Sequence, residues 1–156
     1  MSGNVLLSVG SVLRGDDAAG PYLAKLMTDA PVAGWKVVDG GQCPEDELGY
    51  IRRMEPDTVL VFDAADMGLE PGAVRNLTAG DVAVSCLVST HALPITFLLD
   101  EIKRMAKRVV FLGVQPADTT FFAPLTPAVR EAVDDLFARI AADEGWDGYR
   151  FVADED

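Results

Sequence analysis

The segment that most constrains the fold is residues 58–68, Thr-Val-Leu-Val-Phe-Asp-Ala-Ala-Asp-Met-Gly, where an apolar run stops at a carboxylate. Residues 59–63 show no polar alternation, which is typical of a strand buried on both faces in the middle of a parallel sheet. Asp63 would stand at the carboxyl edge of that strand. Ligands of open α/β sheets bind outside this edge, so Asp63 is a candidate site residue. An aspartate here can equally cap a turn or the next helix.

The rest of the chain alternates between short apolar runs and amphipathic helical patterns. Further strands are expected at residues 5–10, 35–39 and 108–113, with an edge strand at 73–77. Helices are expected to begin at the Asp16-Asp17 pair, at Glu45, near Pro94 and at Thr126-Pro127, where Thr126 would act as the cap. Residues 80–87 do not decide between helix and irregular structure. The alternation predicts an α/β fold, a three-layer α/β/α sandwich around a mostly parallel five-stranded sheet with one antiparallel edge strand.

Length and charge bound the class of protein. At 156 residues the chain is long enough for one domain, which we expect to span residues 1–156. The net charge of -12 disfavours binding to nucleic acid and to anionic membranes, which both reward clusters of Lys and Arg. Many of the acids lie in residues 143–156, which we expect to form a frayed, solvated tail.

The cysteines and the start of the chain predict the compartment. Cys43 and Cys86 have no CxxC spacing and form no disulfide framework, which fits a reducing environment. The first apolar run is too short for a signal peptide or for a membrane span. We therefore expect a cytoplasmic protein that needs no membrane, and we expect it to be a monomer.

Polar residues gather at one predicted edge of the sheet. Right-handed crossovers place the carboxyl ends of the parallel strands together. The residues expected at this edge are Asp17, Asp39, Asp63, Asp66 and Gln115. Adjacent carboxylates repel each other, so one member of the Asp16-Asp17 pair can cap the following helix while the other needs a partner such as a cation.

Two carboxylates and an imidazole would form an oxygen-rich site for a divalent ion. His91 is the only histidine in the chain, and a single histidine is more often structural than a ligand. Such a set suits nickel, manganese or zinc with open positions, unlike a structural zinc site closed by four ligands. The serines lack a nucleophile elbow, and no glycine-rich phosphate loop is present. Residue types alone leave the chemistry open.

The chain resembles the nickel-iron hydrogenase maturation endopeptidases along nearly its whole length. Five segments carry the resemblance in order: residues 9–21 (Val-Gly-Ser-Val-Leu-Arg-Gly-Asp-Asp-Ala-Ala-Gly-Pro), 39–41 (Asp-Gly-Gly), 62–68 (Phe-Asp-Ala-Ala-Asp-Met-Gly), 89–91 (Ser-Thr-His) and 113–116 (Gly-Val-Gln-Pro). Within this family the chain is most similar to the hydrogenase 3 type, which serves the formate hydrogenlyase large subunit.

The resemblance implies a cytoplasmic hydrolase, an aspartic-type or nickel-dependent endopeptidase. It would remove a C-terminal extension from a hydrogenase large-subunit precursor after nickel insertion, with nickel in the substrate as the recognition element. Nickel would arrive with that substrate, although other divalent ions could occupy the site. The positions that match the family's metal contacts are Asp17, Asp63 and His91. Catalytic candidates are Asp17, Asp39 and Asp63, and substrate-binding candidates are Asp39, Gly40, Gly41 and Gln115.

Two positions depart from the family pattern, and two other functions stay open. Ser11 stands where the family usually has Asn, and Gln42 stands where it has a small hydroxyl residue.

A phosphoryl receiver domain also has an acid pair after its first strand, but it carries a lysine where this chain has Gln115. The third hypothesis is a non-catalytic nickel-binding accessory protein. Such a protein would be expected to have more than one histidine to bind the nickel.

Overall fold

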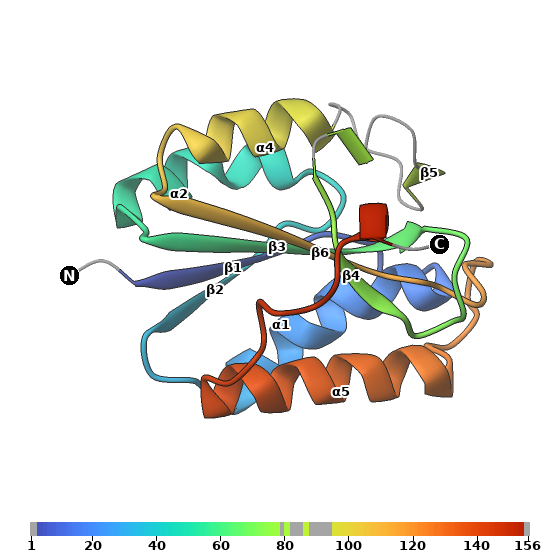
Figure 1. Ribbon diagram of the computed structural model, residues 1–156. Helices are drawn as coiled ribbons and strands as arrows, with labels where there is room; N and C mark the ends of the chain where they lie inside the picture. The colour runs from blue at the N-terminus through green and yellow to red at the C-terminus, as the bar shows by residue number, and fades with distance from the viewer. Residues whose placement is uncertain (1–2, 79, 82–85, 88–94, 155–156) are drawn as a thin grey trace.

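The protein forms a three-layer sandwich around a mixed sheet (Figure 1). A computed structural model describes residues 3–78, 80–81, 86–87 and 95–154. The main path of the sheet has the order β2-β1-β3-β6-β4. Its strands are β1 (Asn4–Ser8), β2 (Trp35–Asp39), β3 (Thr58–Asp66), β4 (Val74–Asn76) and β6 (Arg108–Val114). Pairing along this path is parallel except between β4 and β6, which confirms the predicted antiparallel edge strand.

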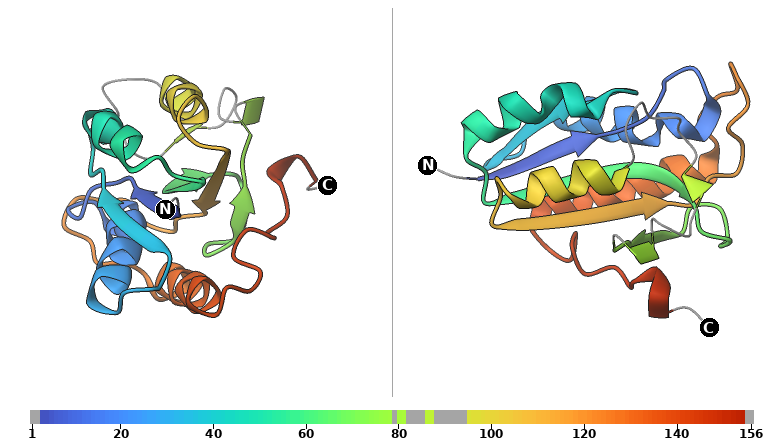
Figure 2. Two further views of the ribbon diagram at one scale, coloured as in Figure 1. Left: turned by 90° about the vertical axis from the view of Figure 1, so that its left-hand side faces the viewer. Right: turned by 90° about the horizontal axis from the view of Figure 1, so that it is seen from above.

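Helices cover both faces of the sheet, as the end-on view in Figure 2 shows. The α-helices are α1 (Ala19–Asp29), α2 (Leu48–Met54), α4 (Ile95–Lys103) and α5 (Pro127–Ala142), and 3-10 helices occupy η1 (Gly15–Ala18), η2 (Pro44–Glu47) and η3 (Val152–Asp154). One buried apolar cluster lies under α1 and α5, and a second lies under α2 and α4. No helix among the described residues is both long and apolar enough to span a bilayer.

The central strand is longer than the sequence pattern indicates. We expected Asp63 to close it, but β3 continues to Asp66. Its extension pairs in antiparallel fashion with the short strand β5 (Cys86–Leu87), which corrects our expectation of helix or irregular structure over residues 80–87. Ala64 and Ala65 are small, uncharged residues that the sequence does not distinguish from a loop, so the added pairing decides the end of the strand.

Both predicted helix caps are wrong in their side-chain contacts. Helix α1 begins after Ala18, and neither acid of the preceding pair caps it. Thr126 is the N-cap residue of α5, as predicted, yet its hydroxyl makes no hydrogen bond to that helix. Instead it donates to the carboxylate of Asp16, at 2.8 Å from Oδ2. The hydroxyl of Thr126 therefore bonds a carboxylate from a distant part of the sequence and not the nearby backbone of its own helix.

Residues 146–151 are docked rather than frayed, which corrects part of the expectation of a frayed, solvated tail over residues 143–156; most described residues of that stretch are exposed, as expected. The side-chain amide of Asn76 donates to the carbonyl oxygens of Tyr149 and Asp147, at 2.7 and 3.3 Å. The backbone N–H of Asn76 donates to Arg150 O at 2.8 Å. Trp146 is buried and meets Trp35 edge to face, with ring centroids 5.0 Å apart. The acidic composition hid these anchors, which hold residues 146–151 against the open edge of β4.

Candidate active site

Gly10 is the point where the loop after β1 meets the loop after β2 and the 3-10 helix η1, at the carboxyl end of the sheet. Its backbone has φ 139°, and a Cβ there would lie 2.0 Å from the carbonyl oxygen of Asp17. Its N–H donates to the carbonyl of Gly41 at 2.9 Å. Only glycine accepts this conformation and this contact. Gly10 therefore brings the loop after β2 and the 3-10 helix η1 against the end of β1.

Asp63 lies within β3, one position beyond the point where β1 ends beside it, and Asp17 lies in η1 after that end of β1. The carboxylate of Asp17 is buried beside Gly10, and its Oδ2 accepts the N–H of Ser11 at 3.0 Å. Val9 N donates to Phe62 O at 3.0 Å, which ties the loop that carries these contacts to the residue before Asp63. Asp63 is completely buried, and its Oδ1 accepts the N–H of Ala64 at 2.8 Å.

Ser11 stands where the resemblance leads us to expect an asparagine, and its contacts show what the serine does there. Its hydroxyl oxygen accepts the backbone N–H of Leu13 at 3.2 Å, and its own N–H reaches Asp17. The serine thus closes a short turn in the loop after β1. The contact to the Asp17 carboxylate comes from the backbone, so it does not depend on the side chain at position 11.

The sheet separates Asp39 from Asp63 by face. In β3, Val61 belongs to the cluster under α2 and α4, whereas Phe62 belongs to the cluster under α1 and α5. Side chains alternate along a strand, so Asp63 points to the α2 and α4 face. Ser8 pairs with both Asp39 and Phe62 in register, which directs Asp39 to the opposite face. Sequence reasoning grouped these acids at one edge without distinguishing the two faces.

Asp39 is exposed and is held by its neighbours. Its Oδ1 accepts the hydroxyl of Ser8 at 3.1 Å and the N–H of Gly41 at 3.2 Å. Gly40 follows with its N–H bonded to Ser8 O, and a Cβ at Gly40 would approach that oxygen to 2.8 Å. The segment 39–41 is therefore a fixed backbone turn that presents one carboxylate to solvent beside the end of β1.

Gln115 fastens the loop that follows β3. Its Oε1 accepts the N–H groups of Met67 and Leu69 at 2.7 and 3.2 Å. Its Nε2 donates to Asp66 Oδ1 at 3.2 Å. The side chain is buried, so these contacts engage the amide within the protein. A substrate contact by Gln115 stays a prediction, and the contacts above give this residue a structural role.

We expect Gln115→Ala to lower the free energy of unfolding by about 1–3 kcal/mol, because it leaves the two N–H groups of the loop without their acceptor. Chemical denaturation measures this loss. Gln42→Ala, at an exposed position in the loop after β2, is the control and should stay within about 0.5 kcal/mol of the parent. Unchanged stability together with a raised KM would identify Gln115 as a substrate-binding residue instead.

Asp16 is the site residue that sequence reasoning missed. It is completely buried, and its carboxylate accepts the backbone N–H groups of Ala117, Asp118 and Thr126 at 2.8, 3.1 and 2.7 Å. The Thr126 hydroxyl donates to the same group. Asp16 therefore clamps η1 to the 117–126 loop and holds Asp17 next to it in the chain. The adjacent acids were the only signal, and we had assigned one of them to a helix cap.

Asp118 sits in that loop and titrates at lower pH than usual. Thr120 holds the pKa of the Asp118 carboxyl below its ordinary value through hydrogen bonds from its side chain and backbone, outweighing a small effect of burial. The Thr120 N–H lies 2.9 Å from Asp118 Oδ1. The carbonyl of Asp118 accepts the N–H of Asp16 at 2.8 Å. The loop thus keeps a fixed shape against η1.

The third member of the proposed metal set, His91, lies outside the described residues. Within the described part of the chain, no three His, Cys, Asp or Glu side chains come together as a metal site. Helix α4, which follows the undescribed stretch 88–94, packs on the same face that Asp63 points to. The grouping of Asp17, Asp63 and His91 remains a prediction from sequence.

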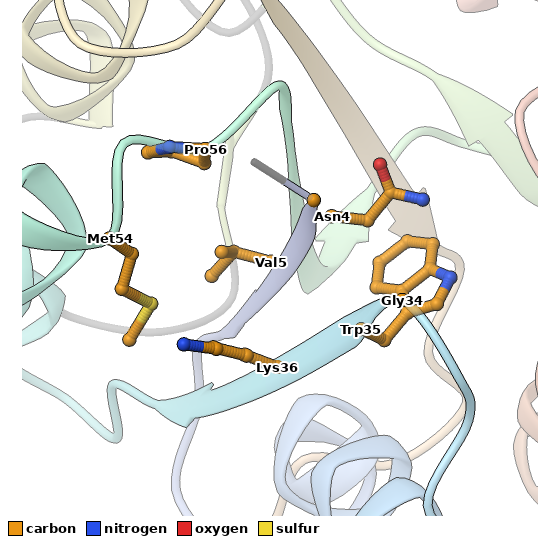
Figure 3. Close-up of a pocket in the computed structure, with 8 residues that line it drawn as sticks. Asn4, Val5, Gly34, Trp35, Lys36, Met54 and Pro56 are labelled. Carbon is orange, nitrogen blue, oxygen red and sulfur yellow. The ribbon is translucent and has the colours of Figure 1, made fainter. Parts of the chain in front are cut away.

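A cavity at the other end of the sheet is not this site. It lies at the amino ends of β1 and β2, with Asn4, Trp35, Lys36 and Met54 among its lining residues (Figure 3). Its volume is about 190 Å³, below the roughly 300 Å³ at which ligand pockets begin. Asp39 is the last residue of β2 and Asp17 lies in η1 after β1, so both are at the opposite ends of these strands.

The chain is similar over most of its length to characterised proteins. A family model described as hydrogenase maturation protease matches residues 21–143. The hydrogenase 3 maturation protease of Escherichia coli K12 is 41% identical over 145 residues, which cover 93% of this chain and 91% of that protein. The solution structure of the Escherichia coli endopeptidase HycI has 39% identity and a TM-score of 0.90, covering 100% and 99% of the two chains.

A more distant structure gives the same result. The nickel-iron hydrogenase maturation protease HycI of Thermococcus kodakarensis is 28% identical, with a TM-score of 0.77 over 90% of this chain and 91% of that one. The relatives thus share both the sequence pattern and the arrangement of layers described above. The family match begins after η1, so the similarity of the Asp16-Asp17 segment rests on the pairwise comparisons.

Proposed function

This chain belongs to the hydrogenase maturation protease family, and we propose that its substrate is the precursor of a nickel-iron hydrogenase large subunit. It is an endopeptidase, and the cleavage would remove the C-terminal extension of that precursor after nickel insertion. The observation that carries the proposal is the placement of two buried carboxylates just beyond the carboxyl end of β1, Asp17 in η1 and Asp63 in the neighbouring strand β3, in a member of this family.

Nickel enters this proposal as part of the substrate. Buried carboxylates usually pair with a cation or coordinate a metal, because burial of an isolated ionised group is costly. Asp17 and Asp63 would supply oxygen ligands and His91 a nitrogen ligand, a set that suits a borderline divalent ion with positions left for substrate groups. The precursor would then be recognised only once its metal is in place, which would restrict proteolysis to the mature centre.

Hydrolysis of the peptide bond requires a water, a base and a proton donor. The water oxygen would attack the scissile carbonyl carbon while a carboxylate takes its proton, and that proton would pass to the leaving amine as the C–N bond breaks. Asp17, Asp39 and Asp63 are the candidates for this carboxylate. Asp39 differs from the other two because it is exposed and points to the other face of the sheet.

The test is cleavage of a nickel-loaded large-subunit precursor beside the same precursor without nickel. We expect the nickel-loaded form alone to lose a short C-terminal peptide, measured by mass spectrometry of the product. The parent chain incubated with an unrelated protein is the specificity control. Equal cleavage of both precursors would contradict the role of nickel as the recognition element but would support the protease activity. Cleavage of neither precursor would contradict the proposed substrate.

The same assay separates this proposal from a nickel-binding accessory protein. Such a protein would bind nickel or the loaded precursor and leave its C-terminus intact.

Free Cys43 is exposed to solvent, which fits a reducing compartment. We propose on this basis that the protein acts in the cytoplasm, and we propose a monomer because its net charge of -12 opposes self-association.

A further inference from the structure

Four large apolar side chains stand in solvent beside the candidate site. They form a surface that we call the apolar rim, and its members are Val12, Leu13, Phe121 and Phe122, with 69, 52, 61 and 82% of their surface exposed. They come from the loop after β1 and from the loop before α5, so folding has gathered them from distant parts of the sequence. Clustered exposed apolar groups mark interaction surfaces more often than single ones do.

The two halves of the apolar rim are held together by direct contacts. Phe122 N–H donates to Leu13 O at 2.7 Å, which joins the loops through their backbones. The two phenyl rings lie 6.1 Å apart between centroids. The guanidinium of Arg14 lies 5.2 Å from the centroid of the Phe121 ring, a cation–π contact. The rim is therefore a defined surface and not a set of unrelated exposed residues.

Phe122 adds backbone strain to its exposure. Its φ of 66° lies in the left-handed region, which is unusual for an aromatic residue and favours glycine or asparagine. Because the ring is exposed, its burial contributes little free energy to offset the strain of this backbone conformation. Strained residues that fold stability does not explain concentrate at functional sites. The conformation directs a large apolar ring outward beside Leu13, where a binding partner would use it.

The apolar rim is continuous with the carboxylate that we assign to the site. Ser11, next to Val12, donates its N–H to the Asp17 carboxylate at 3.0 Å. Val12 also borders a groove of about 300 Å³ between the loops and the start of α1, whose other lining residues include Pro21, Tyr22 and Leu125. A polypeptide bound on the rim would therefore lie beside Asp17 and could continue into this groove, whose lining also includes Lys25 and Arg130.

We propose that the apolar rim docks an apolar stretch of the hydrogenase large-subunit precursor next to the scissile bond. This inference rests on the proposed function, since it assumes that the precursor is the substrate and that its scissile bond lies at the site formed by Asp17 and Asp63 of this chain. A second copy of this chain is a weaker occupant because both copies carry a net charge of -12, and an anionic membrane is disfavoured for the same reason. Exposed aromatic residues supply much of the binding energy in protein complexes.

The test uses the paired variant Phe121→Ser with Phe122→Asn in the full chain. Asparagine tolerates the left-handed backbone at position 122, so we expect the thermal midpoint to stay equal to that of the parent or to rise. With the nickel-loaded precursor as substrate, we expect KM to rise at least tenfold with kcat little changed, because docking precedes the chemistry. Tyr50→Ala, which removes a half-exposed aromatic on α2, is the matched control and should keep the parent KM.

Each outcome bears on a separate claim. A raised KM in the paired variant alone supports docking on the apolar rim, whereas an unchanged KM overturns it. A dimer of the parent by sedimentation that the variant loses, with KM unchanged, would assign the surface to self-association instead. Failure of the parent to cleave the nickel-loaded precursor would contradict the proposed function and remove the basis of this inference with it.

Discussion

Asp63→Asn is expected to lower kcat/KM for the nickel-loaded precursor by about 10²–10⁴-fold, the range that a positioned acid–base group contributes. Asparagine has nearly the same shape, so the packing around the buried residue should persist. It lacks the negative charge that would hold a divalent ion or accept a proton. Mass spectrometry of the precursor C-terminus over time gives the rate, and the thermal midpoint reports whether the fold is retained.

The matched control for this variant is Asp57→Asn, just before the opposite end of the same strand. The side chain of Asp57 is 40% exposed and makes an ion pair with Lys107 at 3.1 Å, which should contribute less than about 1 kcal/mol. We expect it to cleave at the parent rate. Normal cleavage by Asp63→Asn would exclude Asp63 from the site, and loss of cleavage in both variants would indicate a general effect of charge.

Asp16→Ala is expected to destabilise the protein by about 3–5 kcal/mol, because removal of its carboxylate leaves three backbone N–H groups and a hydroxyl without their acceptor. A domain of this size is stable by only about 5–15 kcal/mol, so the loss takes a large share of the total. The unfolding midpoint in urea measures it. The loop from residue 117 to 126 should show increased hydrogen exchange before the rest of the chain does.

The control for Asp16 is Asp29→Ala, which removes an exposed carboxylate paired with Lys25 at 2.6 Å. Exposed ion pairs on a helix contribute little, so we expect a change below about 0.5 kcal/mol. The milder variant Asp16→Asn keeps one oxygen acceptor and should remain folded. Its cleavage rate then reports how far the clamp positions Asp17. Parent-like stability of Asp16→Ala would contradict the structural role of this residue.

Local pattern was sufficient for the order of the elements. The uninterrupted apolar run before Asp63 predicted a central parallel strand, and the weak alternation at residues 73–77 predicted the antiparallel edge strand β4. Both results depend on the period of side chains along a single segment, which the sequence contains in full. The same reasoning selected Asp17 and Asp63 as candidate site residues, although β3 runs past Asp63 to Asp66.

The predictions failed where the partner of a residue lies far away in the chain. Asp16 and Thr126 each have a local role that is common for their residue type, and they bond each other instead, across the fold. Asn76 and Trp146 anchor a terminal segment whose acidic composition suggested a solvated tail. Composition describes the average of a segment, whereas one or two contacts decide whether it docks.

The sequence by itself determined the layered α/β architecture, the family of the chain and the candidate site residues, because these depend on periodicity and on motifs that are local. Only the tertiary structure decided that Asp39 and Asp63 leave the sheet on opposite faces, that Asp16 is a buried clamp, and that Phe122 stands exposed beside Leu13. Such relations arise from strand register and loop packing, which join residues that no local pattern connects.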